Sequence, residues 1–425
     1  MTCSCADGGA PAMRSAPAVS VLRFLVVGYI ALLPYLFEAG PRLNFAPADC
    51  FLVLVLVLAA AHLKLRRSAW TIWHFGILLT FALGSLVAAV RFGELDRYEL
   101  LNKDAGLLLP FLSYAAITSV VTNWENLRLI LRVFTVSVVV ENLLAIGGFL
   151  AAYFFQVATP FTRYEGLRLS GMLLDPNAYG GLLVVALVIC EGASWGQTPL
   201  FQRPMLWFSR ITLDLGILFT FSRSAWLGLG LAFLLFFAIK PMVAVRPLLS
   251  AIAASPCVVF LMGRRFLPVF EEMASRPKQV QQRFDLIHQA IQAFARHPLL
   301  GGGLGSFRLA VGEVAHNSVM WFLADFGILG VSAFLAFLGW FLATAWSAYR
   351  FAPQRQQPLV LALFLAHAAM IGVAMGIEAF YQRYWWLVLG LIGSAYSLSS
   401  DRLSIVHLRR NPSLMFAHRE THVHP

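Results

Sequence analysis

Charged residues are scarce in this chain of 425 residues: Asp, Glu, Lys and Arg make up 12% of it, while 59% is hydrophobic. Soluble globular proteins carry about a quarter charged residues, so this composition excludes that class. The apolar residues fall in continuous blocks of about 17 to 25, the length at which a helix crosses a bilayer. They do not alternate over segments of about ten residues, as in membrane β-barrels. We therefore expect an all-α polytopic membrane protein.

Cysteine is also rare. Five cysteines occur, and Cys50, Cys190 and Cys257 lie inside apolar blocks, so no disulfide framework is expected. No charged n-region leads into a short apolar segment with a cleavage site, and we expect no cleaved signal peptide. No interrupted spans stand in corresponding halves of the chain, which weakens a transporter interpretation. No spacing of Cys, His and carboxylates indicates a metal site, so we expect no metal and no cofactor.

Hydrophobic blocks predict about twelve transmembrane helices in a single domain of residues 19–400, after a leader at 1–18 and before a basic tail at 401–425. With the N-terminus in the cytoplasm, the short loops on that side hold most of the loop cations, as the positive-inside rule requires. The predicted spans are residues 19–37, 46–63, 70–90, 105–121, 133–155, 172–193, 206–222, 224–240, 244–262, 316–347, 358–378 and 381–399.

The only long loop of this topology covers residues 263–315 on the periplasmic side and carries seven cations. They favour an anionic partner, although a solvated basic loop is the plainer alternative. Apolar residues at spacings of three and four predict an amphipathic helix over 278–296, lying at the membrane surface or packed on the bundle. The glycine run GGGLG after it predicts a flexible connector, without the ending of a phosphate-binding loop. The predicted apolar face consists of Val280, Phe284, Ile287, Ile291 and Phe294.

Two arginines on the periplasmic side are candidates for binding phosphate. Arg223 stands between two spans with almost no loop around it, and Arg283 lies beside the apolar face of the loop helix. A guanidinium is a permanently charged, fork-shaped donor that binds phosphate bidentately. Two of them from different elements can hold the pyrophosphate of a lipid without a metal ion. Snorkelling or pairing at a helix end is the alternative for Arg223.

His316 and Asn317 open the tenth span. A histidine can take a proton from a sugar hydroxyl near neutral pH, and Asn317 can orient it or bind the sugar, although capping and packing are commoner at a helix start. Glu378, at the outer end of the eleventh span, is the best carboxylate to orient His316 or pair with an arginine, or else it is a helix-end charge in water. Asp325 lies deeper in the tenth span, where a structural role fits.

Further polar residues fall on the same side of the predicted topology. Charged groups at the apolar margin cost free energy unless they are paired or hydrated, so their clustering predicts a polar cavity that opens outward. Asp175, Pro176 and Asn177 also form a typical helix start, which explains much of their pattern. Glu141 and Asp214 lie within spans, and no role is assigned to them. The further substrate-binding candidates are Arg168, Asp175, Asn177, Ser222 and Arg383.

Four segments resemble the superfamily of O-antigen ligases and O-antigen polymerases: RLSGMLLDPNAYGG, TFSRSAW, RFDLIHQAIQAFARHPLLGGGLGSF and AHNSVMWFLADFGILG. The resemblance covers residues 165–395, and the last two segments are the most specific. Asp325 is a departure, because the family more often has glutamate there. The long loop is also shorter than in many ligases.

The resemblance implies a bacterial inner-membrane glycosyltransferase of C-type architecture, metal-independent and inverting, with its active site facing the periplasm. The donor would be a glycan on undecaprenyl pyrophosphate. The acceptor would be lipid A-core in an O-antigen ligase, or a growing glycan in an O-antigen or exopolysaccharide polymerase. Arg223 and Arg283 match the arginines that hold the pyrophosphate, and His316 matches the histidine that activates the acceptor hydroxyl. The alternative is a transporter or flippase for an anionic lipid-linked substrate. No nucleic-acid partner is expected.

Overall fold

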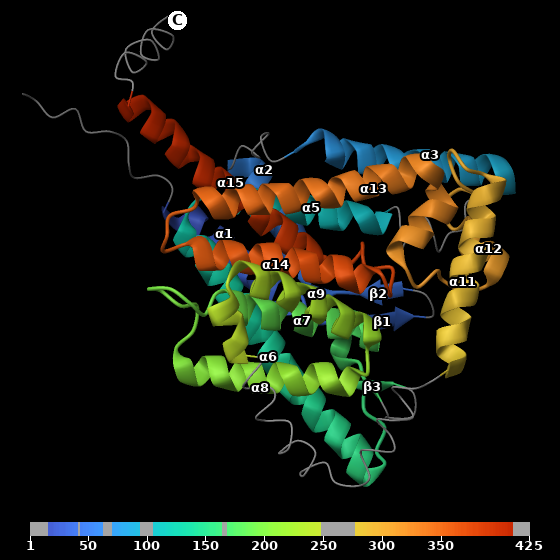
Figure 1. The fold of residues 1–425 in the computed structure, drawn as a ribbon, viewed down its shortest axis with the longest axis horizontal. Helices are drawn as coiled ribbons and strands as arrows, with labels where there is room; N and C mark the ends of the chain where they lie inside the picture. Colours follow the sequence, from blue (N-terminus) through green and yellow to red (C-terminus); the bar gives the residue numbers. More distant parts are fainter. Residues whose placement is uncertain are drawn as a thin grey trace, which may run out of the picture.

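The computed structural model describes six stretches of the chain, and helices make up most of each (Figure 1). These stretches are residues 16–40, 43–62, 70–93, 105–163, 168–247 and 277–410. The strands within them form two short antiparallel hairpins, β1 (Phe37–Gly40) with β2 (Leu43–Phe45) and β3 (Thr162–Arg163) with β4 (Arg168–Leu169). The helices of the first third are α1 (Ala16–Leu32), α2 (Pro47–His62), α3 (Ile72–Phe92), α5 (Ala105–Val120) and α6 (Trp124–Phe155).

The remaining helices follow a short 3-10 turn at Gly171–Leu173. They are α7 (Pro176–Gly192), α8 (Arg203–Thr220), α9 (Arg223–Ile239), α11 (Pro277–Arg296), α12 (Ser306–Val311), α13 (Ser318–Phe351), α14 (Gln357–Ala374) and α15 (Arg383–Arg410).

Eleven of the twelve predicted spans overlap one of these helices; of the other one, residues 244–262, only 244–247 lie within the described residues, and they are helical. By length and composition, α3, α6, α13 and α14 are able to cross a membrane. Five further apolar helices are shorter, α7 and α9 among them. The structure therefore confirms a helical protein of membrane character, and the number of spans stays a prediction.

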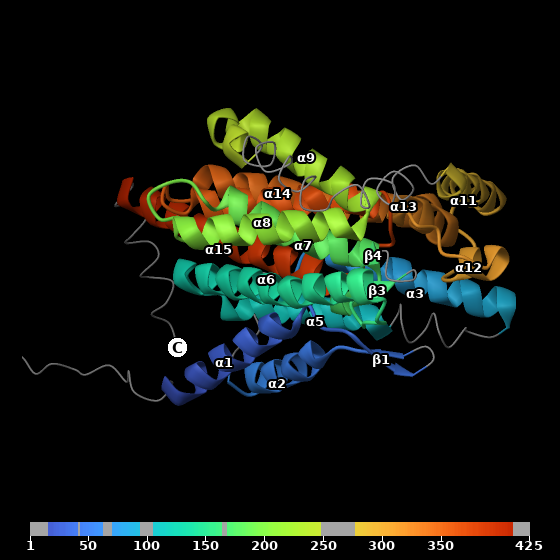
Figure 2. The same cartoon turned by 90° about the horizontal axis from the view of Figure 1, so that it is seen from below.

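Helices α7 and α14 lie at the centre of the bundle. α14 packs against α7, α9, α13 and α15, while α7 also packs against α6 and α8. The side chains of α7 are buried along its whole length, as expected of a helix that is apolar on every face. Figure 2 shows α9 lying outside α14 and tilting away from the rest of the bundle.

A buried carboxylate joins α6 to the start of α7. Glu141 Oε1 accepts a hydrogen bond from the backbone N–H of Met172 at 2.9 Å, and Oε2 accepts one from the hydroxyl of Tyr179 at 2.5 Å. A buried polar group is stabilising only when it is paired, and both oxygens of this carboxylate are. Glu141, left without a role by the sequence, therefore fixes the 3-10 turn that leads into α7.

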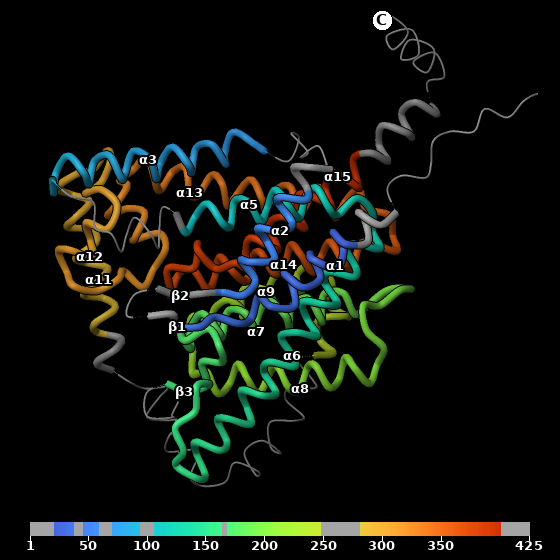
Figure 3. Tube along the Cα trace, turned by 180° about the vertical axis from the view of Figure 1, so that it is seen from behind, coloured from blue at the N-terminus to red at the C-terminus, as the bar shows by residue number. Residues whose placement is uncertain are grey.

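Helix α11 runs across one end of the bundle, at a steep angle to α13 and α14 (Figure 1). It packs against α13 and α12. The C-terminal end of α15 lies at the opposite end, so the end that carries α11 is named the α11 end below. Figure 3 shows α3 running beside α13 and reaching the α11 end. The prediction of a helix over 278–296 is thus confirmed, and the helix is packed on the bundle.

The face of α11 that contacts the bundle differs from the predicted apolar face. Leu286 and Ala290 are 4% and 0% exposed, whereas Phe284 and Ile291 are 62% and 47% exposed. Leu286 and Ala290 are one turn apart and share one face of the helix, whereas Phe284 and Ile291 lie on other sides of it. Ile287 and Phe294 are half-buried, so the predicted face is confirmed in part and wrong at Phe284 and Ile291; the side chain of Val280 lies outside the described residues.

Helix α13 bends at Gly327, whose φ of 65° and ψ of −161° are not helical. The first segment, which starts at Ser318, leans toward α3, and the second returns along the bundle (Figure 1). The tenth predicted span is therefore two helical segments joined at a sharp bend.

Candidate functional site

The turn between α8 and α9 presents Arg223 at the α11 end. Phe221 ends α8 with a left-handed backbone (φ 47°), and Ser222 caps α9 by accepting a hydrogen bond from the backbone N–H of Ala225 at 3.3 Å. The hydroxyls of Ser222 and Ser224 are also hydrogen-bonded to each other, at 3.0 Å. Arg223 is thus the first residue of a helix, where the helix dipole favours an anion.

Arg283 of α11 lies close to this turn and is half-buried. Burial lowers the pKa of Arg283, the charge of Arg223 lowers it further, and Asp175 partly offsets both effects. Electrostatic effects of this kind act between neighbouring groups. The structure therefore brings together one arginine from α9, one from α11 and the carboxylate that caps α7.

Gly376 lies between α11 and the first turn of α9. A Cβ atom at Gly376 would lie 3.3 Å from Nη1 of Arg283 and 2.5 Å from Cβ of Ser224. The second distance is shorter than real Cβ atoms allow, so only glycine fits without a shift of its neighbours. The guanidinium of Arg283 thus rests against the connection between α14 and α15.

The same connection holds the residues that flank His316. Asn317 Nδ2 donates a hydrogen bond to the carbonyl of Met375 at 3.1 Å. Ser318 Oγ donates one to the carbonyl of Ile377 at 2.8 Å. The connection around Gly376 therefore contacts Arg283 on one side and the start of α13 on the other. Arg283 and the segment that carries His316 are thus held by the same connection. Arg223 and Arg283 are called the arginine pair below.

His316 itself has a left-handed backbone, with a φ of 48°. Such a conformation is uncommon outside glycine, and its strain has to be held by the surroundings. On the one side, Glu378 Oε1 accepts a hydrogen bond from the backbone N–H of Ala315 at 3.1 Å. On the other, Asn317 caps α13 by accepting hydrogen bonds from two backbone N–H groups of its first turn. Glu378 and Asn317 therefore fix the backbone that carries the imidazole.

Arg168 is buried and its guanidinium is occupied by other parts of the protein. Nε donates to the carbonyl of Thr220 at 2.8 Å, and Nη2 donates to Asn177 Oδ1 at 3.0 Å and to the carbonyl of Phe221 at 3.4 Å. These bonds satisfy carbonyls at the end of α8, which have no partner within the helix. Asp175 caps α7 through the N–H of Asn177 at 2.7 Å, as the sequence predicted. Through these contacts Arg168 stabilises the turn between α8 and α9 that carries Arg223.

Arg383 is paired with a residue that the sequence did not single out. Its Nε and Nη2 atoms donate to the two carboxylate oxygens of Asp49, at 2.9 Å and 2.7 Å. This bidentate pair joins the start of α15 to the first turn of α2. The guanidinium of Arg383, which the sequence predicted to bind substrate, is therefore paired with a carboxylate of the protein itself.

Asp325 has the structural role that the sequence suggested. It is 1% exposed and accepts four hydrogen bonds: from the backbone N–H groups of Gly305 and Phe307, the hydroxyl of Ser306 and the indole N–H of Trp321, at 2.9 to 3.0 Å. The carboxylate thereby fixes the start of α12 against the first segment of α13.

The glycine run at 301–305 is not a flexible connector, contrary to the prediction. Its residues are all buried. The backbone N–H of Gly302 donates to the carbonyl of Ala324 at 2.9 Å, and that of Leu304 donates to the carbonyl of Gly84 at 3.0 Å. Glycines are needed here because the run passes directly against the bend of α13 and the backbone of α3.

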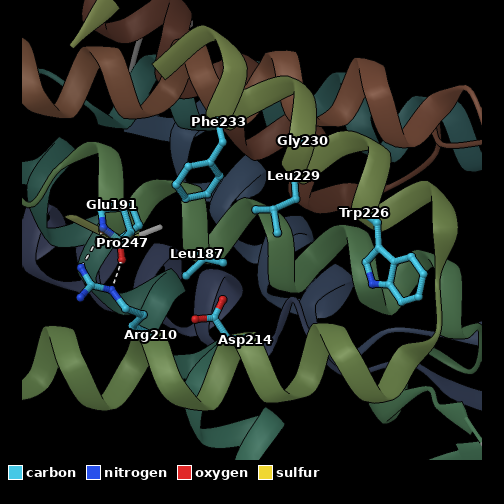
Figure 4. Close-up of a pocket in the computed structure, with 9 residues that line it drawn as sticks. All are labelled: Leu187, Glu191, Arg210, Asp214, Trp226, Leu229, Gly230, Phe233 and Pro247. Carbon is cyan, nitrogen blue, oxygen red and sulfur yellow. Dashed lines mark hydrogen bonds and ion pairs between the residues drawn. The ribbon is translucent and has the colours of Figure 1, made fainter. Parts of the chain in front are cut away.

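A cavity of 330 Å³ lies between α7, α8 and α9 (Figure 4). Side chains of α9 from Trp226 to Phe233 form one wall, and the other carries polar groups. Arg210 and Glu191 form a bidentate ion pair there, while Asp214 stands nearer the middle. Trp226 lies one turn after Arg223, so the cavity begins close to the arginine pair. The sequence pattern of single polar residues within apolar spans gave no indication of it.

The described residues contain no cluster of three or more His, Cys, Asp or Glu side chains that could hold a metal ion. The two cysteines within them, Cys50 and Cys190, are both free.

Comparison with known protein families gives a match to the O-antigen ligase family over residues 208–335. The matched region runs from α8 to the second segment of α13 and includes Arg223, Arg283 and His316. No curated protein matches the chain. The family match and the apolar helices together indicate a membrane protein that processes glycans. Three of the four sequence segments lie within the matched region, which supports their resemblance to the superfamily of O-antigen ligases and polymerases over residues 208–335.

Proposed function

We propose that the protein is an inverting glycosyltransferase of the bacterial inner membrane, which needs no metal ion. It transfers a glycan from undecaprenyl pyrophosphate to an acceptor hydroxyl at the periplasmic face. The α11 end then faces the periplasm. The acceptor is either lipid A-core, for an O-antigen ligase, or the end of a lipid-linked glycan, for a polymerase.

The observation that carries this proposal is the pair of arginines at the α11 end. Arg223 and Arg283 come from separate elements, and the charge of the first lowers the pKa of the second. Two like charges held together repel each other, and the repulsion is stronger where water is partly excluded. A pyrophosphate relieves this repulsion and accepts bidentate hydrogen bonds from both guanidiniums. The pair is therefore best explained as a site for a multiply charged anion.

The proposed reaction is a single displacement. The imidazole of His316 takes the proton of the acceptor hydroxyl, whose oxygen forms a bond to the anomeric carbon of the donor glycan. The bond from that carbon to the pyrophosphate oxygen breaks, and the pyrophosphate leaves with the electron pair. Arg223 and Arg283 stabilise the negative charge that develops on the leaving group. Attack from the side opposite the leaving group inverts the anomeric configuration.

A transfer assay tests the proposal and identifies the acceptor. Purified protein in detergent is incubated with a glycan on undecaprenyl pyrophosphate, with and without lipid A-core, and the size and attachment of the glycan are followed by gel electrophoresis and mass spectrometry. Glycan on lipid A-core indicates a ligase, and longer lipid-linked chains without lipid A-core indicate a polymerase.

Variants of the arginine pair supply the control. Arg223→Gln and Arg283→Gln should each abolish transfer, whereas Arg203→Gln, an exposed arginine at the start of α8, should not. If folded protein transfers no glycan to either acceptor but moves the lipid-linked donor across vesicle membranes, the protein is a flippase and the proposal is wrong.

A further inference from the structure

Two arginines and a histidine that the site above does not use lie together where α3 reaches the α11 end. They are Arg91 in the last turn of α3, Arg296 at the end of α11 and His297 directly after it, and all three are exposed. Desolvation and the charges of Arg91 and Arg296 lower the pKa of His297, which places both guanidiniums near the imidazole. Neither arginine has a carboxylate partner in the stretches that the structure describes. We call these three residues the Arg91 patch.

The glycine run at 301–305 contacts the residues of the Arg91 patch and holds them in place. Nη1 of Arg91 donates a hydrogen bond to the carbonyl of Gly302 at 3.4 Å. A Cβ atom at Gly303 would lie 2.6 Å from the backbone nitrogen of Ala88, so α3 approaches the run as closely as only glycine permits. The carbonyl of His297 accepts a hydrogen bond from the N–H of Gly301 at 3.0 Å. The patch is therefore held in place by backbone contacts on both sides.

An exposed apolar stripe runs along α3 and ends at the patch. Its residues recur at spacings of three and four, which places them on one face of the helix. α3 is long and apolar enough to cross a membrane, and only 22% of it is buried within the protein. This face is therefore suited to contact lipid chains. The stripe consists of Ile72, Phe75, Leu79, Leu83, Leu86 and Val90, which are 37% to 77% exposed.

The patch and the arginine pair lie toward opposite ends of α11. Thirteen residues separate Arg283 from Arg296, which corresponds to about 20 Å along the helix at 1.5 Å per residue. Helix α13, whose first segment begins two residues after His316, packs against α11. Figure 1 shows α11 extending from the side of α9 to the end of α3. Two cationic sites thus stand at one end of the bundle, on two sides of α13.

We propose that the Arg91 patch binds the phosphate-bearing headgroup of the acceptor lipid. The inference rests on the proposed function and adds the location and the charge of the acceptor. The lipid chains lie along the α3 stripe in the outer leaflet, and the phosphate lies between Arg91, Arg296 and His297. The reacting hydroxyl belongs to a sugar that extends from this headgroup toward His316. Donor and acceptor then bind at separate cationic sites and meet at the start of α13.

A binding experiment tests the inference without turnover. Lipid A that carries its phosphates, the same lipid after removal of the phosphates, and the pyrophosphate-linked donor are each titrated into purified protein and followed by native mass spectrometry. The double variant Arg91→Gln/Arg296→Gln should bind phosphorylated lipid A about tenfold more weakly than the wild type, because it loses two charge-assisted contacts. Its binding of dephosphorylated lipid A and of the donor should be unchanged.

Two matched variants make the outcome specific. Arg283→Gln should weaken binding of the donor and leave binding of phosphorylated lipid A unchanged, and Arg203→Gln should change neither. Equal binding of phosphorylated lipid A by the double variant and the wild type would overturn the inference, whatever the transfer assay shows. Binding of phosphorylated lipid A at the patch without transfer would refute the proposed function alone.

Discussion

Nη1 of Arg283 lies against the backbone of Gly376, where an added Cβ atom would approach it to 3.3 Å. Met375 and Ile377, the two neighbours of Gly376, accept hydrogen bonds from Asn317 and Ser318 at the start of α13. One short segment between α14 and α15 therefore sets the positions of both a leaving-group arginine and the proposed base. Any displacement of this segment should affect both parts of the reaction.

Replacing Gly376 with alanine should lower the transfer rate by about tenfold or more. The new Cβ atom would lie 2.5 Å from Cβ of Ser224, so the first turn of α9 or the connection has to move, and small displacements of reacting groups are costly for catalysis. The rate is measured with the transfer assay at saturating donor. Gly339→Ala is the control, because nothing lies within 4 Å of its added Cβ atom and alanine favours the helix. Equal rates for Gly376→Ala and wild type would contradict the contact.

Replacing Arg283 with lysine should make transfer sensitive to alkaline pH. Burial and the charge of Arg223 disfavour a positive charge at this position. Arginine remains protonated nevertheless, whereas lysine starts from a pKa of about 10.4, and the same surroundings lower it. The lysine therefore loses its charge, and its hold on the pyrophosphate, as the pH rises through the lowered pKa. Relative to wild type, the variant's rate should fall between about pH 8 and about pH 10. Parallel pH profiles would rule out this explanation.

Glu378→Ala should lower kcat while leaving KM for the donor nearly unchanged. The substitution removes the acceptor of the Ala315 N–H, so the backbone beside His316 is released while the arginine pair is kept. Glu378→Gln should restore most of the rate, because an amide oxygen accepts the same hydrogen bond. If Glu378→Gln lowers kcat as much as Glu378→Ala does, the charge of Glu378 is what the reaction requires, and its role as a positioning residue is wrong.

Asp325→Ala should destabilise the protein by at least about 3 kcal/mol, because four donors lose their acceptor in a buried place. The free energy of unfolding is followed by tryptophan fluorescence in detergent. Asp325→Asn should also be destabilising, since its NH₂ group would face two of the donors. Asp285→Ala, on the exposed side of α11, should change stability little. Similar stabilities for the Asp325 and Asp285 variants would refute the structural role of Asp325.

The sequence predicted the helices well, for physical reasons. Blocks of apolar residues long enough to cross a bilayer are a strong signal, and the predicted spans overlap helical residues wherever the structure describes them. Arg223 and His316 became candidates because a charged or titratable residue at a span boundary stands out against an apolar background. The spacing of α11 revealed a helix but predicted its buried face only in part, because the small residue Ala290 was not counted among the apolar positions.

Other features depend on contacts between distant segments, which a single sequence does not contain. Nothing near Asp49 indicates that it pairs with Arg383, more than three hundred residues later. Gly376 has no turn signal around it, and its role is visible only when Arg283 and Ser224 lie beside it. The glycine run resembles a flexible linker in sequence, because the backbone contacts with α3 and α13 that require glycine are tertiary.

The central claim is that His316 acts on the acceptor after the arginine pair has bound the donor. It is tested most directly by measuring donor binding and glycan transfer on the same preparation of His316→Ala, with His288→Ala, an exposed histidine of α11, as the control. We expect His316→Ala to bind the lipid-linked donor as tightly as the wild type and to transfer no glycan, and His288→Ala to do both. Transfer by His316→Ala at the wild-type rate would contradict the account, because the acceptor hydroxyl would then be activated by another group.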